Sequence, residues 1–429
     1  MNISLGLAMV LAILGVLLAA MLGVRKLAKA RGWHAELQRK IVHVGAGGMA
    51  CALPWLLPAP WQVWALLALT ALAMLALRLP AFSGVGGTLH DVGRRSWGDF
   101  LLVLAVALIY LLHQGIAVLY VLPLAILTLA DAAAALAGIR YGRMFFATED
   151  GTKSVEGSVM FFLVALILGM VCLLLMTEIP RASVITVALA VAGFATLLEA
   201  DSWHGFDNLF LPMGAYILLA TLLIVPPWQA AAQIVIAIAG AGAVYALRER
   251  MGASLQVARV HALAMFLLLC VVFPMNAVLP ALALILPAVF YAPLRDGPLA
   301  LGWVAALALL SFVYFAYEPA SGRTAINLFG LAFAGMVAAW AGFAARPAIA
   351  SLTALGLAAI WLVVAAVNPE TAQWHGDIRL LGIVSILASA AIAATASRVL
   401  APRPILSITA LGSAGPSLFL VATLSIGAP

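Results

Sequence analysis

One stretch of this 429-residue chain combines residue types that suit chemistry on a phosphate. It runs from Asp131 to Ser158 and reads DAAAALAGIRYGRMFFATEDGTKSVEGS. Asp131 lies within an otherwise apolar segment, where a carboxylate costs roughly 2.5–3.5 kcal/mol, so a functional site is favoured over a structural hydrogen bond. Beside phosphates, a carboxylate typically binds Mg²⁺, which takes one or two carboxylates together with phosphate oxygens.

We expect a helix to begin at the end of this stretch. Ser154 is a candidate N-cap, and Glu156 suits the first turn because a helix dipole attracts negative charge there. Lys153 opposes that dipole unless an anion lies nearby, and helix N-termini bind phosphates. We therefore predict a phosphate-binding segment that also includes Gly157 and Ser158. It is not a P-loop, because GxxxxGK[ST] is missing and no strand is expected here.

Two glycines, Gly138 and Gly142, lie between Asp131 and this segment at a spacing of four. Such spacing is typical of close helix packing in membranes. It also lets a backbone approach a ligand closely, so both interpretations stay open.

A second group of candidates lies in QRKIVHVGAGG, where Arg39 and His43 share one helix face. One interpretation is a basic anchor at the membrane surface, with Glu36 pairing with Lys40 at the favoured spacing. The other is a basic wall that faces a phosphate-bearing substrate.

Another motif, RRSWGDF, offers Arg95 as a clamp for a phosphate. The alternative is a structural role, in which Trp97 lies at the membrane interface and Ser96 caps the following helix.

Acidic residues gather near position 200. Glu199 and Asp201 lie at an expected helix C-terminus, where acids are unfavourable and call for a cation, either a metal or an arginine. Asp207 and Asn208 begin the next apolar segment, and each is also a candidate N-cap.

Composition places these motifs in a membrane. The chain is 66% hydrophobic and 9% charged, with a mean hydropathy of +1.16. We therefore expect an all-α, polytopic helical bundle of about 16 transmembrane helices, the first over residues 3–24. The three cysteines form no CxxC pattern, so no disulfide or zinc site is predicted. The net charge of +6 is spread along the chain and does not indicate nucleic-acid binding.

The basic residues also predict an orientation. Of the 22 Lys and Arg residues, all except Arg181, Arg323 and Arg379 fall at or next to alternate breaks between apolar segments. The positive-inside rule makes those breaks cytoplasmic and puts both termini outside. Every candidate above then lies on the cytoplasmic face of the cytoplasmic membrane.

The chain divides into two halves of different character, 1–225 and 229–429, with a seam at residues 226–228. Polar loops and candidate residues fill the first half. The second half has short loops and few ionisable groups, so we interpret it as a scaffold, a lipid-facing groove or a partner surface. No internal repeat joins the halves.

Five pieces of the first half together resemble a known family. They are RKIVH at 39–43, RRSWG at 94–98, DAAAALAGIRYG at 131–142, TKSVEGS at 152–158 and EADSWHGFDNLFLP at 199–212. In this order, over residues 39–224, they resemble the CTP-dependent lipid-alcohol kinases, which include phytol kinase, dolichol kinase and CTP-dependent diacylglycerol kinase. The last piece looks most like the phytol kinase branch. Residues 229–429 match nothing in that family.

The resemblance implies transfer of a phosphoryl group from CTP, or another nucleoside triphosphate, to the hydroxyl of a membrane lipid alcohol such as phytol or a polyprenol. Asp131 would bind Mg²⁺ or another divalent cation, with Glu156 or Asp207 as a second ligand. Asp131 or Asp207 would act as the base. The remaining site residues would contact nucleotide or phosphate: Arg39, His43, Arg95, Gly138, Gly142, Lys153, Ser154, Gly157 and Ser158.

Two other functions stay open. A phosphatidate cytidylyltransferase also joins CTP to a membrane lipid, but its Lys-Asp and Gly-His-Gly-Gly signature is missing here. A transporter or lipid flippase would suit sixteen spans, but only Asp131 is clearly an intramembrane acid and no paired broken helices occur in matching halves. A third possibility is a kinase in the first half whose second half moves, presents or scavenges the lipid. The oligomeric state and the identity of the lipid are not predicted.

Overall fold

The computed structural model describes residues 3–77, 98–148, 151–201, 205–272, 274–321, 324–367 and 379–426. Within these ranges almost every element is a helix, and seven helices are long and apolar enough to cross a membrane. Eight shorter apolar helices accompany them. The chain is therefore an integral membrane protein of helical architecture, while the count of about 16 spans stays a prediction.

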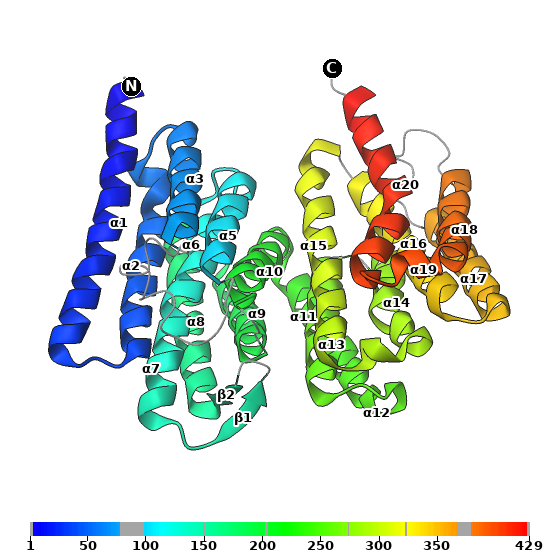
Figure 1. Ribbon diagram of the computed structural model, residues 1–429, viewed down its shortest axis with the longest axis horizontal. Coiled ribbons are helices and arrows are strands. Elements are labelled where there is room, and N and C mark those ends of the chain that lie inside the picture. The colour runs from blue at the N-terminus through cyan, green and yellow to red at the C-terminus, as the bar shows by residue number, and fades with distance from the viewer. Residues whose placement is uncertain are drawn as a thin grey trace. The chain divides into compact units, whose positions relative to one another are not determined.

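The chain forms two compact units, Met1–Ala231 and Ala232–Pro429. The expected seam at residues 226–228 lies just before this division. The first unit contains every candidate residue named above and begins with a long helix, α1 (Ile3–Arg31) (Figure 1). Its other helices are α2 (Ala35–Leu56), α3 (Pro60–Leu77), α5 (Gly98–Leu112), α6 (Ala117–Ala125), α7 (Asp131–Tyr141), α8 (Val155–Met176), α9 (Arg181–Ala200) and α10 (Asp207–Leu222).

A π-helical segment, η2 (Ile126–Ala130), joins α6 to α7 and ends directly before Asp131. Pro123 lies just ahead of it and cannot donate a backbone hydrogen bond to the preceding turn, which weakens regular α-helical bonding there. Such π-segments within α-helices occur frequently at functional sites.

The π-segment packs tightly against α2 at Gly47. A Cβ on Gly47 would lie 2.1 Å from Oγ1 of Thr128, so only glycine fits at this contact. The neighbouring Gly48 has open space instead. Gly47 therefore fixes α2 against η2, one to two turns from Lys40 and His43 on the same helix.

Helices α7 and α8 also cross closely, again through glycines. A Cβ on Gly138 would lie 2.9 Å from Oγ of Ser154, and one on Gly157 would lie 3.0 Å from the carbonyl oxygen of Ala134. This matches the small-residue packing expected between membrane helices. The two helices lie side by side in Figure 1, with a short hairpin at their end.

That hairpin corrects the sequence analysis, which expected no strand. Strands β1 (Phe145–Thr148) and β2 (Gly151–Ser154) pair antiparallel, with Phe146 opposite Lys153. Alternation along a strand gives Lys153 and Ser154 opposite directions. Ser154 is buried, whereas Lys153 is only partly so.

The second unit contains α11 (Pro227–Ala246), most of which lies after the division, and ten further helical elements among the described residues. They are α12 (Arg248–Met251), α13 (Leu255–Val271), α14 (Pro274–Phe290), η3 (Ala292–Arg295), α15 (Gly297–Ser321), α17 (Pro347–Val367), α18 (Arg379–Thr395), α19 (Ser397–Leu400) and α20 (Pro404–Ile426), together with a central helix, α16 (Thr324–Ala344). Neighbouring helices surround α16, whose residues from Leu328 to Ala341 are buried. Gly335 and Gly342 allow its close contacts with Gly412 and Ala390. This unit is therefore organised around one buried apolar helix.

Candidate active site

The most informative contact of the first unit joins α2 to the start of α7. The Nζ of Lys40 donates a hydrogen bond of 2.6 Å to Oδ2 of Asp131, and the lysine is only 4% exposed. The Nε2 of His43 lies 3.6 Å from the same oxygen and 3.2 Å from the carbonyl oxygen of Leu127. Two basic side chains, one helical turn apart, therefore face one carboxylate that is 16% exposed.

The expected local pair between Lys40 and Glu36 is also present, but as the longer of the two ion pairs that Lys40 makes. Lys40 lies 4.0 Å from Glu36, beyond hydrogen-bonding distance, whereas Arg39 makes two hydrogen bonds to Glu36, of 2.6 and 3.0 Å. Arg39 is 52% exposed. Arg39 therefore lies at the accessible rim of the site, and Lys40 lies inside it.

A second ion pair joins the hairpin to the end of α9. The Nζ of Lys153 donates 2.7 Å to Oε1 of Glu199 and also donates to the backbone carbonyl of Glu199. The exposed carbonyls at a helix C-terminus favour a cation. Two unusual features of the sequence therefore explain each other: Lys153 has its anion, and Glu199 has its cation.

The start of α8 confirms one local prediction. Ser154 caps the helix, because its hydroxyl oxygen accepts the backbone N–H of Gly157 at 3.1 Å. The hydroxyl of Ser158 donates to the carbonyl oxygen of Ser154 at 3.4 Å. Both serines are thus engaged in the helix terminus.

Glu156 lies apart from Asp131. Its carboxylate accepts the backbone N–H of Met144 at 3.3 and 3.4 Å, which ties α8 to the start of the hairpin. Gly138, at the level of this helix start, follows Asp131 by seven residues, or about 10 Å along α7. The structure therefore does not bring together the two predicted metal ligands Asp131 and Glu156.

Asp207 is the better second carboxylate. It is the first residue of α10, and Phe206 rather than Asp207 occupies the N-cap position. Its charge interacts with those of Lys153, Asp131 and Lys40. Asp207 thus links the Lys40–Asp131 pair to the Lys153–Glu199 pair. We call these residues the charge cluster: Glu36, Arg39, Lys40, His43, Asp131, Lys153, Glu199 and Asp207.

The structure gives Gly138 and Gly142 a packing environment. Gly138 faces Ser154 and Gly157 across the helix contact, and Gly142 lies against Phe145 and Ser154. A nucleotide at these two positions would have to share the space with α8. Their role in nucleotide binding stays a prediction. Arg95 lies outside the described residues.

Three members of the charge cluster were not predicted as site residues: Glu36, Lys40 and Glu199. Lys40 was assigned to Glu36 because of its spacing, and Glu199 was noted only as needing a cation. A usable signal was present for Lys40, since it lies between Arg39 and His43 in the RKIVH piece.

The side chains of the charge cluster supply only some of the ligands that a hard cation such as Mg²⁺ needs. No group of three or more His, Cys, Asp and Glu side chains that could hold a metal ion occurs among the described residues. The carboxylates of Asp131 and Asp207 are nevertheless the kind of ligand that Mg²⁺ takes when phosphates supply the remaining oxygens. The site therefore fits a metal that arrives with a nucleotide better than one bound by the protein alone.

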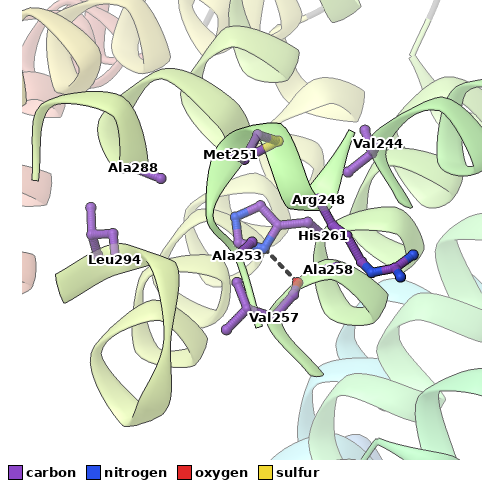
Figure 2. A pocket seen from close by; sticks show the side chains of 9 residues that line it. All are labelled: Val244, Arg248, Met251, Ala253, Val257, Ala258, His261, Ala288 and Leu294. Carbon is purple, nitrogen blue, oxygen red and sulfur yellow. Dashed lines mark hydrogen bonds between the residues drawn. The ribbon is translucent and has the colours of Figure 1, made fainter. Parts of the chain in front are cut away.

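A pocket in the second unit lacks this chemistry. It is lined mostly by apolar side chains, with Arg248 and His261 as its polar members (Figure 2). His261 is buried, and its Nδ1 lies 2.8 Å from the carbonyl oxygen of Val257. Without a carboxylate in its lining, this pocket offers no set of metal ligands for phosphoryl transfer.

Comparison with known proteins identifies the family. The chain is 33% identical over 188 residues to the phytol kinase of Synechocystis sp., an alignment that covers 42% of this chain and 77% of that relative. The chain belongs to the lipid-alcohol kinase family. No family model matches it, and no solved structure does.

Membership in the lipid-alcohol kinase family supports a kinase-type phosphotransferase that acts at a membrane. It does not single out one member of the family. The candidate site residues are assigned from the charge cluster. Its cations and carboxylates come from α2, α7, β2, α9 and α10.

Proposed function

We propose that this protein transfers a phosphoryl group from CTP, or another nucleoside triphosphate, to the hydroxyl of a membrane lipid alcohol. An isoprenoid such as phytol or a polyprenol is the acceptor class that we favour, because the relative is named a phytol kinase. The last sequence piece, at 199–212, points to the same branch. The second unit has no assigned part in this reaction.

One observation carries the proposal: the first unit holds two buried or half-buried lysine–carboxylate pairs, Lys40–Asp131 at 2.6 Å and Lys153–Glu199 at 2.7 Å. Glu199 interacts with the charges of Asp131 and Asp207 as well as with that of Lys153. Phosphoryl transfer requires positioning and charge neutralisation more than covalent catalysis by the protein. A site that combines ammonium groups with carboxylates supplies both.

In the proposed mechanism, Lys153 and the N-terminus of α8 bind the transferred phosphate, because donors aimed at developing charge stabilise the transition state. Arg39, at the rim, and His43 contact the triphosphate. Asp131 and Asp207 would hold the divalent cation, which would neutralise charge on the phosphate oxygens. Asp207 is our candidate for the base that accepts the proton of the lipid hydroxyl.

Location follows from the distribution of basic residues. We propose that the charge cluster opens to the cytoplasmic face of the cytoplasmic membrane, where a nucleotide arrives from water and a lipid alcohol from the bilayer. Its presence at the ends of several apolar helices supports this placement.

A labelling experiment tests the proposal. The full-length protein in nanodiscs is incubated with Mg²⁺, an acceptor lipid and CTP labelled at either the α or the γ position. A kinase moves only the γ label to the lipid and releases CDP. Movement of the α label would instead indicate a cytidylyltransferase. Failure to bind any nucleotide would favour a transporter. Phytol, a polyprenol and diacylglycerol serve as acceptors, and ATP serves as the alternative donor.

A further inference from the structure

Lys40 occupies the position that a divalent cation would need. Its ammonium lies 2.6 Å from Oδ2 of Asp131, and the pair is well buried, with the lysine 4% and the aspartate 16% exposed. A metal can bind this oxygen only after the ammonium leaves it. The Lys153–Glu199 pair repeats the arrangement at 2.7 Å.

Because the pair is buried, neither charge can be left without a partner of opposite charge. Removing one partner of a buried ion pair leaves a charge that must find another partner. Lys40 carries its ammonium on a flexible four-carbon stem, which can turn from a carboxylate to a phosphate while the helix stays fixed. Arg39 is paired with Glu36 rather than with Asp131, so its movement would not free the Asp131 carboxylate.

We propose that Lys40 exchanges its partner when nucleotide binds: it neutralises Asp131 in the nucleotide-free protein and moves to the nucleotide phosphates. Asp131 then accepts a divalent cation only together with the nucleotide. Lys40 thus becomes a further phosphate-binding residue and sets the order in which the metal enters. This inference rests on the proposed function of the same site.

Metal binding without nucleotide tests the exchange directly. Mn²⁺ affinity is measured by electron paramagnetic resonance on the full-length protein in nanodiscs. We expect weak binding by the wild type. Lys40→Met should tighten Mn²⁺ binding at least tenfold, because Asp131 then lacks its ammonium. Lys40→Arg should stay weak, because it retains a cation.

Two further variants make the result specific. Lys29→Met removes an exposed lysine of α1 outside the charge cluster and should leave Mn²⁺ affinity within about twofold of wild type. Adding Asp131→Asn to Lys40→Met should abolish the tightened site. If Lys40→Met does not fold, as judged by thermal unfolding, Lys40→Gln replaces it. In wild-type protein, a non-hydrolysable CTP analogue should tighten Mn²⁺ binding at least tenfold.

Tight Mn²⁺ binding by wild-type protein without nucleotide would overturn the exchange. Unchanged Mn²⁺ affinity in both Lys40→Met and Lys40→Gln would overturn it as well. These readouts need no turnover. If the Mn²⁺ pattern holds while no lipid acquires label, the proposed kinase function fails and the ion-pair exchange stands.

Discussion

Lys40 and Asp131 lie 91 positions apart in the chain, yet their Nζ and Oδ2 atoms are 2.6 Å apart. This contact joins the RKIVH piece on α2 to the aspartate that follows the π-segment. A second ion pair, Lys153–Glu199, joins the hairpin to α9 in the same unit.

The first prediction concerns the contact that positions α2. Gly47→Ala should lower the free energy of unfolding by about 1–3 kcal/mol, because its Cβ would overlap the side chain of Thr128. Thermal unfolding in detergent micelles measures the effect. Gly48→Ala, the adjacent control, should cause no loss. Adding Thr128→Ala to Gly47→Ala should restore part of the stability, and the absence of any restoration would contradict the contact.

The second prediction separates packing from nucleotide binding at the crossing of α7 and α8. Gly157→Ala and Gly138→Ala should each lower the unfolding temperature, with or without nucleotide, because the added Cβ meets Ala134 or Ser154. Gly193→Ala on α9 has open space and serves as the control. Unchanged stability with weakened nucleotide binding in Gly138→Ala would instead favour the role predicted from the sequence.

The third prediction concerns the Lys153–Glu199 pair. A double-mutant cycle with Lys153→Met and Glu199→Gln should give a coupling of about 0.5–3 kcal/mol in unfolding free energy. Lys153→Met should also lower kcat/KM of phosphoryl transfer more than Glu199→Gln does, because we assign the phosphate contact to the lysine. Additive effects on stability would show that the pair is not coupled.

Part of this site could be predicted from the sequence and part could not. The capping of α8 by Ser154 is a local interaction, so the order of residues was enough to find it. The pairing of Lys40 with Asp131 could not be found in this way, because Glu36, four residues away, is a local alternative partner. Nothing in the spacing of a chain relates two residues 91 positions apart on different helices.

The hairpin escaped prediction for a different reason. Each strand has only four residues, and the segment lies between two apolar helices whose pattern dominates the region. Yet the strand Phe145–Thr148 is rich in aromatic and β-branched side chains, which favour strands. A strand at Phe145–Thr148 pairs with Gly151–Ser154, so Lys153 lies on a strand rather than in an irregular loop.

The fourth prediction concerns orientation in the membrane. Thr152 and Glu178 are exposed and lie at consecutive breaks in the sequence, the first predicted to be cytoplasmic and the second outside. Single cysteines at these positions, with the three native cysteines replaced by alanine, are labelled with a membrane-impermeant maleimide. Thr152→Cys should react only in inside-out vesicles, and Glu178→Cys only in right-side-out ones. The reverse pattern would place the site on the outer face.

The most direct test of the account is phosphoryl transfer by Asp131→Asn protein in nanodiscs, measured with γ-labelled CTP and the best acceptor lipid. We predict that this variant loses roughly 10²–10³-fold in kcat, the scale typical of losing one essential charge-stabilising group. Asp296→Asn, which changes an exposed aspartate of the second unit, should keep full activity. Transfer at the wild-type rate by folded Asp131→Asn protein would contradict the central role of Asp131.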